Sequence, residues 1–142
     1  MKESQLRTIL LVAAIYHLAL GAFMFFAAGA FYDSLGKFPP ENHHYIKDVS
    51  TFYIALGIVL FISVRRPSWR VPVLLFATIE YAIHAINHLV DVNESASDFT
   101  GWFDFFSLAG IALILAALTT IAWRVHPDPE PEEDAPKEIL PE

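Results

Sequence analysis

The sequence predicts an all-α integral membrane protein, a four-helix bundle that runs up-down-up-down with both termini in the cytoplasm. Hydrophobic residues make up 55% of the 142 residues, above the share usual in soluble domains. Charged residues separate four apolar runs, each close to the ~20 residues of helix that cross a ~30 Å hydrocarbon core. The runs lack the alternation of polar and apolar residues that is typical of membrane β-barrel strands.

The four helices are predicted within one transmembrane domain, residues 1–124, at about residues 7–31, 46–64, 70–91 and 102–123. The first run is longer than the roughly 7–15 apolar residues of a signal peptide, so we expect a retained helix. The second run is short and should draw Asp48 to the membrane boundary. Ser68 can cap the third helix, and Pro72 is tolerated in its first turn. The fourth helix lies between Trp102 and Trp123, as aromatic belts prefer.

Basic residues predict the direction of insertion. Six of them precede the first helix, fill the second loop or end the fourth helix: Lys2, Arg7, Arg65, Arg66, Arg70 and Arg124. An even number of crossings places all six on one side of the membrane and leaves Lys37 and Lys47 on the other. The positive-inside rule then puts both termini in the cytoplasm.

Residues 125–142 are predicted to form a disordered, acidic, Pro-rich cytoplasmic tail, because this segment cannot bury enough apolar surface to fold. Much of the net charge of -7 lies in this tail, so the net charge says little about partners. The chain has no basic stripe that would indicate nucleic acid binding. The absence of cysteine excludes disulfides and thiolate metal sites.

One polar stripe interrupts the third helix, in the stretch EYAIHAINHLVD. At ~100° per residue, its polar side chains fall within about 100° of one another on the helix surface. They are Glu80, His84, Asn87, His88 and Asp91. Because this helix runs outward, Glu80 should lie near the bilayer centre and Asp91 near the outer interface. Ionisable groups cost roughly 2.5–3.5 kcal/mol each inside a bilayer, so we expect the stripe to face the bundle interior or a wet cavity.

Other helices supply polar groups to the same half of the membrane. Asp48 opens the second helix, His44 lies one turn before it, and Asp104 enters the fourth helix. His17 lies near the middle of the first helix, among small residues that allow close helix contact. Depth and helical phase therefore predict one outward-facing pocket of histidines and carboxylates.

We expect this pocket to bind a divalent metal ion. Two histidines four residues apart on a helix can reach one ion from the same face. The predicted metal ligands are His84, His88, Asp48, His44 and Asp91, and the secondary candidates are Glu80, His17, Asn87 and Asp104. Imidazole and carboxylate ligands suit Zn, Mn, Fe or Cu(II), whereas the lack of Cys argues against Cu(I).

Three alternatives remain open. The polar groups could form an interhelical network, at ~0.6 kcal/mol per hydrogen bond, in an accessory subunit of a membrane complex. Glu80 and His84 could form a proton relay. His17 and His84 could ligate a haem from both faces, or the pocket could take a quinone. An enzyme is the less expected class, because nothing in the sequence names a substrate.

Two motifs carry a family resemblance. An Asn-x-His-x-x-x-Asp motif precedes the second helix, and His-x-x-Asn-His-x-x-Asp closes the third. They fall on Asn42, His44, Asp48, His84, Asn87, His88 and Asp91. Over roughly residues 42–104 the chain resembles a group of small bacterial four-helix integral membrane proteins with a DoxX-like layout, for which no activity is established. The resemblance implies the fold and a place in the bacterial cytoplasmic (inner) membrane. The expected partners are the lipid bilayer and another membrane protein or a second copy.

Overall fold

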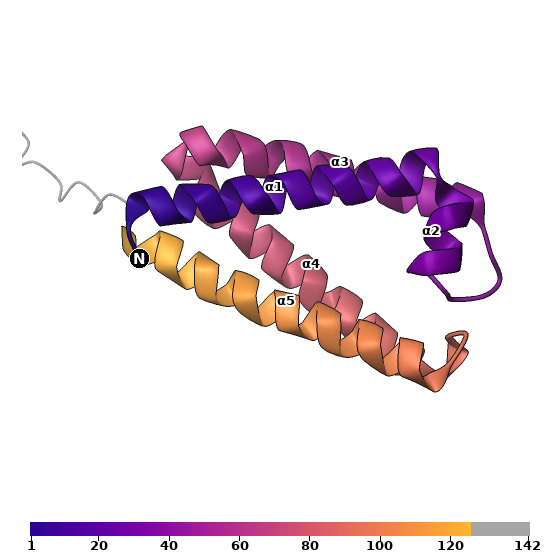
Figure 1. Cartoon of the computed structure of the whole chain (residues 1–142). Coiled ribbons are helices and arrows are strands. Elements are labelled where there is room, and N and C mark those ends of the chain that lie inside the picture. Colours follow the sequence, from indigo (N-terminus) through magenta and orange to yellow (C-terminus); the bar gives the residue numbers. More distant parts are fainter. Residues whose placement is uncertain (126–142) are drawn as a thin grey trace, which may run out of the picture.

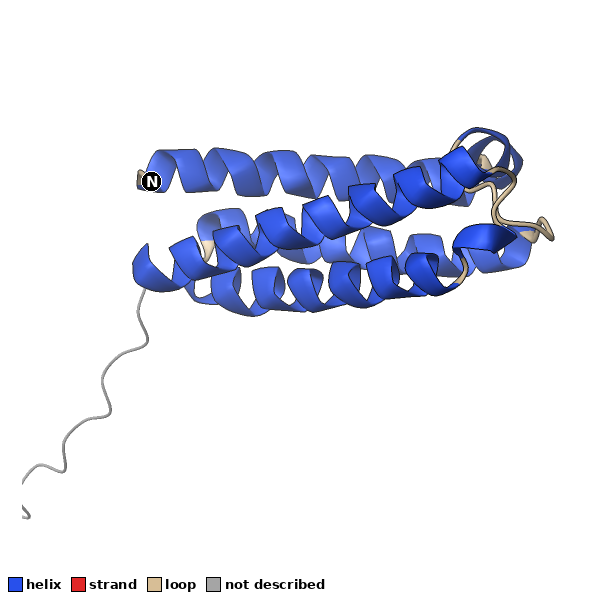
Figure 2. Ribbon diagram, turned by 90° about the horizontal axis from the view of Figure 1, so that it is seen from below, coloured by secondary structure: helices blue, strands red, loops and turns tan. Residues whose placement is uncertain are grey.

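A computed structural model describes residues 1–125, which contain helices and no strand. The four long helices are α1 (Glu3–Phe26), α3 (His43–Arg65), α4 (Arg70–Val90) and α5 (Asp98–Val125). The short helix α2 (Ala28–Ser34) follows α1, and two single 3₁₀ turns, η1 (Pro67–Trp69) and η2 (Val92–Glu94), flank α4. Successive long helices run in opposite directions (Figures 1 and 2). The predicted tail of residues 125–142 lies, apart from Val125, outside the described residues.

The predicted helical class is confirmed, and all four long helices are long and apolar enough to span a membrane. Their outer faces carry large apolar side chains that a soluble protein would not leave in water. Val12, Ile83, Ile86 and Leu113 are each 60% exposed or more. Soluble monomers rarely expose apolar patches of this extent, so the surface suggests a lipid environment.

The first helix differs from its predicted extent of residues 7–31. Helix α1 ends at Phe26, and at Ala27 the backbone leaves the helical conformation. The 24 residues of α1 already span ~36 Å, more than a ~30 Å hydrocarbon core. The chain then turns back: α2 crosses the end of the bundle (Figure 1), and the half-buried Phe31 packs edge-on against Phe23, with ring centroids 5.9 Å apart. The other three helices lie within four residues of their predicted ends.

The long helices associate as two pairs, α1 with α3 and α4 with α5. Small residues let α1 and α3 approach closely. A Cβ atom added at Gly57 would lie 2.9 Å from the backbone nitrogen of Leu18, and one at Gly21 would lie 2.7 Å from the Ile54 side chain. The pairs meet near the N-terminus and diverge toward α2 (Figure 1). Divergence leaves space between the pairs at the α2 end.

At the opposite end of the bundle, a buried arginine joins the two helix pairs. Arg70, at the start of α4, is fully buried and makes two hydrogen bonds of 2.8 and 2.9 Å to the carboxylate of Glu3 in α1. It also donates to the backbone carbonyls of Ser63 and Val64 at the end of α3. These carbonyls belong to the last turn of a helix, where partners within the helix are missing. Arg70 therefore joins α1, α3 and α4 at this end.

Candidate functional site

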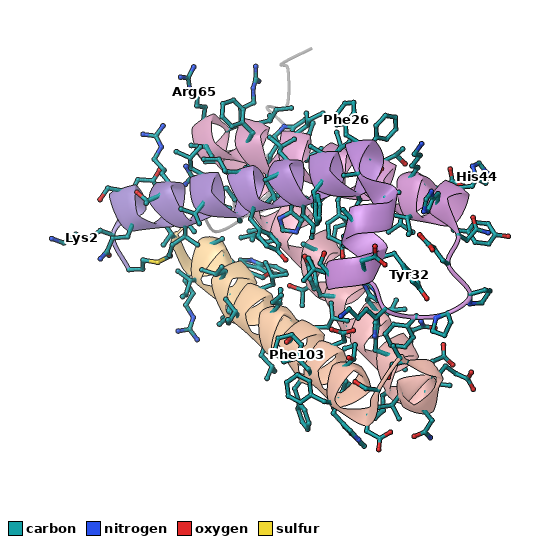
Figure 3. The ribbon with its side chains drawn as sticks, turned by 45° about the vertical axis from the view of Figure 1, so that its right-hand side comes forward. Lys2, Phe26, Tyr32, His44, Arg65 and Phe103 are labelled. Atoms are coloured by element: carbon teal, nitrogen blue, oxygen red, sulfur yellow. The ribbon has the colours of Figure 1, made fainter. Side chains whose placement is uncertain are left out.

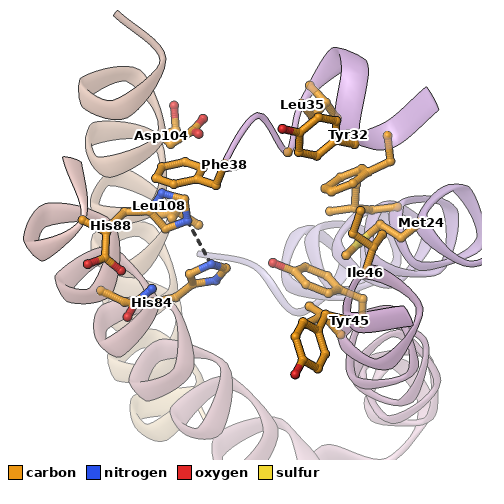
Figure 4. Close-up of a pocket in the computed structure, with 18 of the residues that line it drawn as sticks. Met24, Tyr32, Leu35, Phe38, Tyr45, Ile46, His84, His88, Asp104 and Leu108 are labelled. Atoms are coloured by element: carbon orange, nitrogen blue, oxygen red, sulfur yellow. Dashed lines mark hydrogen bonds between the residues drawn. The ribbon is translucent and has the colours of Figure 1, made fainter. Parts of the chain in front are cut away.

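The space between the diverging pairs is a pocket of about 500 Å³, within the usual size range of small-molecule sites. One wall is apolar and aromatic and comes mainly from α1 and α3, with Tyr16, Leu20, Met24, Ile46, Val49 and Tyr53. The opposite wall is polar and comes from α4 and α5, with His84, Asn87, His88, Asp91, Asp104 and Ser107. Figure 4 shows His84 and His88 facing Met24 and Ile46 across the pocket.

His84 and His88 form the centre of the polar wall. They lie one turn apart on α4, and their Nε2 atoms are 3.2 Å apart, so one ring donates a hydrogen bond to the other (Figure 4). Both side chains are half-buried. The Nδ1 atom of His88 is buried and has no hydrogen-bond partner among residues 1–125, and the ring of Phe38 packs edge-on against His88 at 4.7 Å. The prediction that both histidines face one pocket agrees with this arrangement.

Glu80 stands behind His84, one further turn toward the bundle centre. Its Oε1 atom is 3.4 Å from Nδ1 of His84, and its Oε2 atom is buried without a hydrogen-bond partner in the part of the chain that the structure describes. Glu80, His84 and His88 therefore form a continuous chain along α4, from a carboxylate through two imidazoles to the pocket. A carboxylate behind an imidazole is the usual means of orienting a metal-binding histidine.

Two further carboxylates line the same pocket. Asp91, at the end of α4, interacts electrostatically with His88, and Asp104 of α5 interacts with His84. Asn87 also faces the pocket from α4. These three predicted residues are thus on the polar wall, although the structure brings neither carboxylate into direct contact with the imidazoles within residues 1–125.

His44 and Asp48 are not brought to this pocket. They form their own pair on the surface of α3, with His44 Nε2 3.4 Å from Asp48 Oδ2, and their side chains are 79% and 60% exposed. The α3 residues that do line the pocket include Tyr45, Val49 and Tyr53. At ~100° per residue, His44 and Asp48 project from a different face of α3. That rotation is set by the close packing of α3 on α1.

His17 lies deeper, outside the polar wall. It is 3% exposed, and both ring nitrogens have partners: Nδ1 with the carbonyl of Ala13 at 2.7 Å and Nε2 with the hydroxyl of Tyr81 at 3.0 Å. Because a carbonyl can only accept, Nδ1 carries a hydrogen, and Nε2 of a neutral ring then accepts from Tyr81. The ring also stacks on Tyr53. His17 therefore joins α1 to α4 through its hydrogen bond with Tyr81.

The aromatic wall and the cover of the pocket were not predicted from the sequence. Phe31 and Tyr32 of α2 line the pocket, as do Leu35 and Phe38 in the segment that follows. Their position at the pocket depends on the break in the helix at Ala27. No Pro or Gly at that position predicts this break. The tyrosines at positions 16, 53 and 81 could have been found, because they lie at the depth of His17 and Glu80.

Within residues 1–125, the structure has no group of three or more His, Cys, Asp or Glu side chains arranged to hold a metal ion. No protein-family model, curated protein or solved structure matches this chain.

Proposed function

We propose that this protein is a multi-pass protein of the bacterial cytoplasmic membrane that binds a divalent metal ion through His84 and His88, in a pocket open to the outer side. The observation that carries the proposal is the 3.2 Å separation of the two Nε2 atoms. Two nitrogens on one tetrahedral zinc, with Zn–N bonds of ~2.0–2.1 Å, lie about 3.3–3.4 Å apart. The distance between the two Nε2 atoms is thus close to the one that binding of a single zinc ion requires.

The neighbours of the imidazoles also support a metal. Glu80 can orient His84 through Nδ1, 3.4 Å away, and leave Nε2 free to bind the ion. Two buried polar atoms, Oε2 of Glu80 and Nδ1 of His88, have no hydrogen-bond partner, which is costly unless a proton, water or ion compensates. A carboxylate and two histidines within a membrane helix mark a functional site by default.

Imidazole nitrogens with carboxylates nearby suit Zn, Mn, Fe or Cu(II). Two protein ligands leave coordination positions that face the pocket, where water, a small molecule, or Asp91 or Asp104 after a side-chain rotation can bind. An ion held in this way is exchangeable, which fits a protein that handles or senses the metal better than one that uses it as a structural brace.

The alternative is a structural role in a larger membrane assembly, in which the polar groups only join helices. The His17–Tyr81 hydrogen bond, buried and fully partnered, favours that role for the deeper cluster. It does not account for the hydrogen bond between His84 and His88, which lies within one turn of the same helix.

The test is the metal content of the full chain purified in mild detergent. Wild-type protein should retain or take up one divalent ion, and the His84→Ala/His88→Ala variant should lose it. The exposed pair on α3 provides a matched control: His44→Ala/Asp48→Ala should bind the ion like wild type. Equal loss in both variants, or no uptake of Zn, Mn, Fe or Cu by wild type, would refute the proposal.

Orientation has a separate test, which the lack of cysteine makes simple. A single cysteine in place of Ser95, in the α4–α5 loop, should react with a membrane-impermeant thiol reagent added to intact cells. A cysteine in place of Ser68 should react only after lysis. The reverse pattern would invert the topology and direct the pocket to the cytoplasm.

A further inference from the structure

A second cavity lies between α3 and α4, outside the polar pocket. It measures about 340 Å³ and is lined by Phe52, Ala55, Leu56 and Val59 of α3 and by Trp69, Pro72, Val73 and Phe76 of α4 and the turn before it. Apart from the indole nitrogen of Trp69, these side chains are apolar. We call this cavity the α3–α4 groove.

The α3–α4 groove follows from the way the helices pair. Helix α3 packs along α1 and helix α4 along α5, so α3 and α4 meet mainly near their connecting turn and then diverge (Figure 1). Each helix presents residues at spacing i, i+3, i+4, i+7 to the groove, which is one face of a helix. The rings of Phe52 and Phe76, 5.8 Å apart, bound it on the side away from the turn.

The turn end of the groove is basic. Arg65 and Arg66 precede η1 and are exposed, and neither has an ion pair within residues 1–125. No Asp or Glu occurs between Asp48 and Glu80 in the sequence. Arg70 is in contrast committed to Glu3. Figure 3 shows Arg65 pointing away from the helices at the end of the bundle that also holds Lys2. Trp69, 45% exposed, adds an indole donor.

We propose that the α3–α4 groove binds an anionic phospholipid, with one acyl chain between α3 and α4 and the phosphate against Arg65 and Arg66. The charge at the turn selects an anion, and the apolar groove that leads from it selects hydrocarbon. An extended peptide is less suitable, because its backbone in this groove would find no hydrogen-bond partners. The inference does not depend on metal binding.

The experiment is a native mass spectrometry titration of the full chain in detergent, with palmitoyl-oleoyl phosphatidylglycerol and with phosphatidylcholine carrying the same chains. Wild type should bind the anionic lipid more tightly. Arg65→Gln/Arg66→Gln should weaken phosphatidylglycerol binding about 30-fold, which corresponds to ~1 kcal/mol per basic residue, and leave phosphatidylcholine binding unchanged. Ala55→Phe, which fills the groove, should weaken binding of both lipids.

Arg124→Gln is the matched control, an exposed arginine at the same end of the bundle but on α5. It should change neither affinity by more than about twofold. The proposal is wrong if Arg124→Gln reduces phosphatidylglycerol binding as much as the double variant does, or if Ala55→Phe leaves both lipids bound as in wild type. Ala55→Leu serves in the same assay if the larger side chain lowers the melting temperature.

Discussion

His84 contacts two chemically different neighbours through its two ring nitrogens. Nδ1 lies toward the Glu80 carboxylate, and Nε2 lies toward His88. A carboxylate that accepts from Nδ1–H fixes the tautomer in which Nε2 carries a lone pair. The charge of Glu80 can thus influence the pocket through the ring of His84. In the metal site that we propose, Glu80 is therefore a positioning residue.

Replacement of Glu80 tests this role. Glu80→Gln keeps the size of the side chain but removes the charge that favours Nδ1–H on His84. We expect zinc affinity to fall about 10- to 100-fold, measured by competition with a chromogenic chelator. Asp48→Asn, which removes an exposed carboxylate beside a histidine, should leave zinc affinity unchanged. A comparable loss of zinc affinity in that variant would mean that the total negative charge of the protein, and not the contact of Glu80 with His84, sets the affinity.

The sequence predicted most of the side chains of α4 that face the pocket, but it did not do so for α3. The stripe from Glu80 to Asp91 lies on one helix, so the period of the helix alone brings His84 and His88 together. The position of Asp48 depends on how α3 rotates about its axis, which no pattern within α3 reveals. The rotation is set by Gly57 and Gly21, through the contact of α3 with α1.

At the element scale, the close contact of α1 and α3 decides which residues reach the pocket. Gly57→Ala should lower the melting temperature in detergent, because the new Cβ would lie 2.7 Å from Cγ and 2.9 Å from the backbone nitrogen of Leu18. Gly110→Ala provides the control, since a Cβ there would meet no atom within 4 Å.

Only Gly57→Ala should lower the melting temperature. In an open position the higher helix propensity of Ala stabilises by up to ~1 kcal/mol, so Gly110→Ala should raise the melting temperature or leave it unchanged. If Gly57→Ala also raised it, α1 and α3 would not be as close as described. A shift of α3 would then bring His44 and Asp48 nearer to the pocket.

The break between α1 and α2 shows the limit of predicting helix ends from hydropathy. Hydropathy indicates where a chain can be in lipid, and residues 7–31 satisfy it throughout. It does not indicate where the chain turns, because the turn depends on a tertiary contact, that of the half-buried Phe31 with Phe23. Helix ends marked by charges, such as Arg65 and Arg70, were predicted to within a residue.

At the scale of the whole molecule, the two helix pairs are joined at one end by Arg70 and enclose the pocket at the other. Arg70→Gln should destabilise the bundle by about 3 kcal/mol, the lower end of the range for breaking a buried ion pair, because the Glu3 carboxylate keeps contact with solvent. Unfolding in mixed micelles measures this. Arg124→Gln should cost less than about 0.5 kcal/mol, and an equal effect of both substitutions would contradict the role of Arg70.

The contacts by which Arg70 joins α1, α3 and α4 could not be predicted from the sequence, because there Arg70 is one of three arginines in a turn. Its burial depends on Glu3, which is 67 residues away. The helical class and the four candidate spans, in contrast, depend on local composition. They could be read directly from the chain.

The central claim is that His84 and His88 together bind one divalent ion. The most direct test is the zinc-edge X-ray absorption spectrum of the full chain in detergent, loaded with one equivalent of zinc. We predict two imidazole nitrogens at about 2.0–2.1 Å, present in His44→Ala/Asp48→Ala and absent in His84→Ala/His88→Ala. A zinc spectrum without imidazole scattering, or one that the loss of His84 and His88 leaves unchanged, would contradict the account.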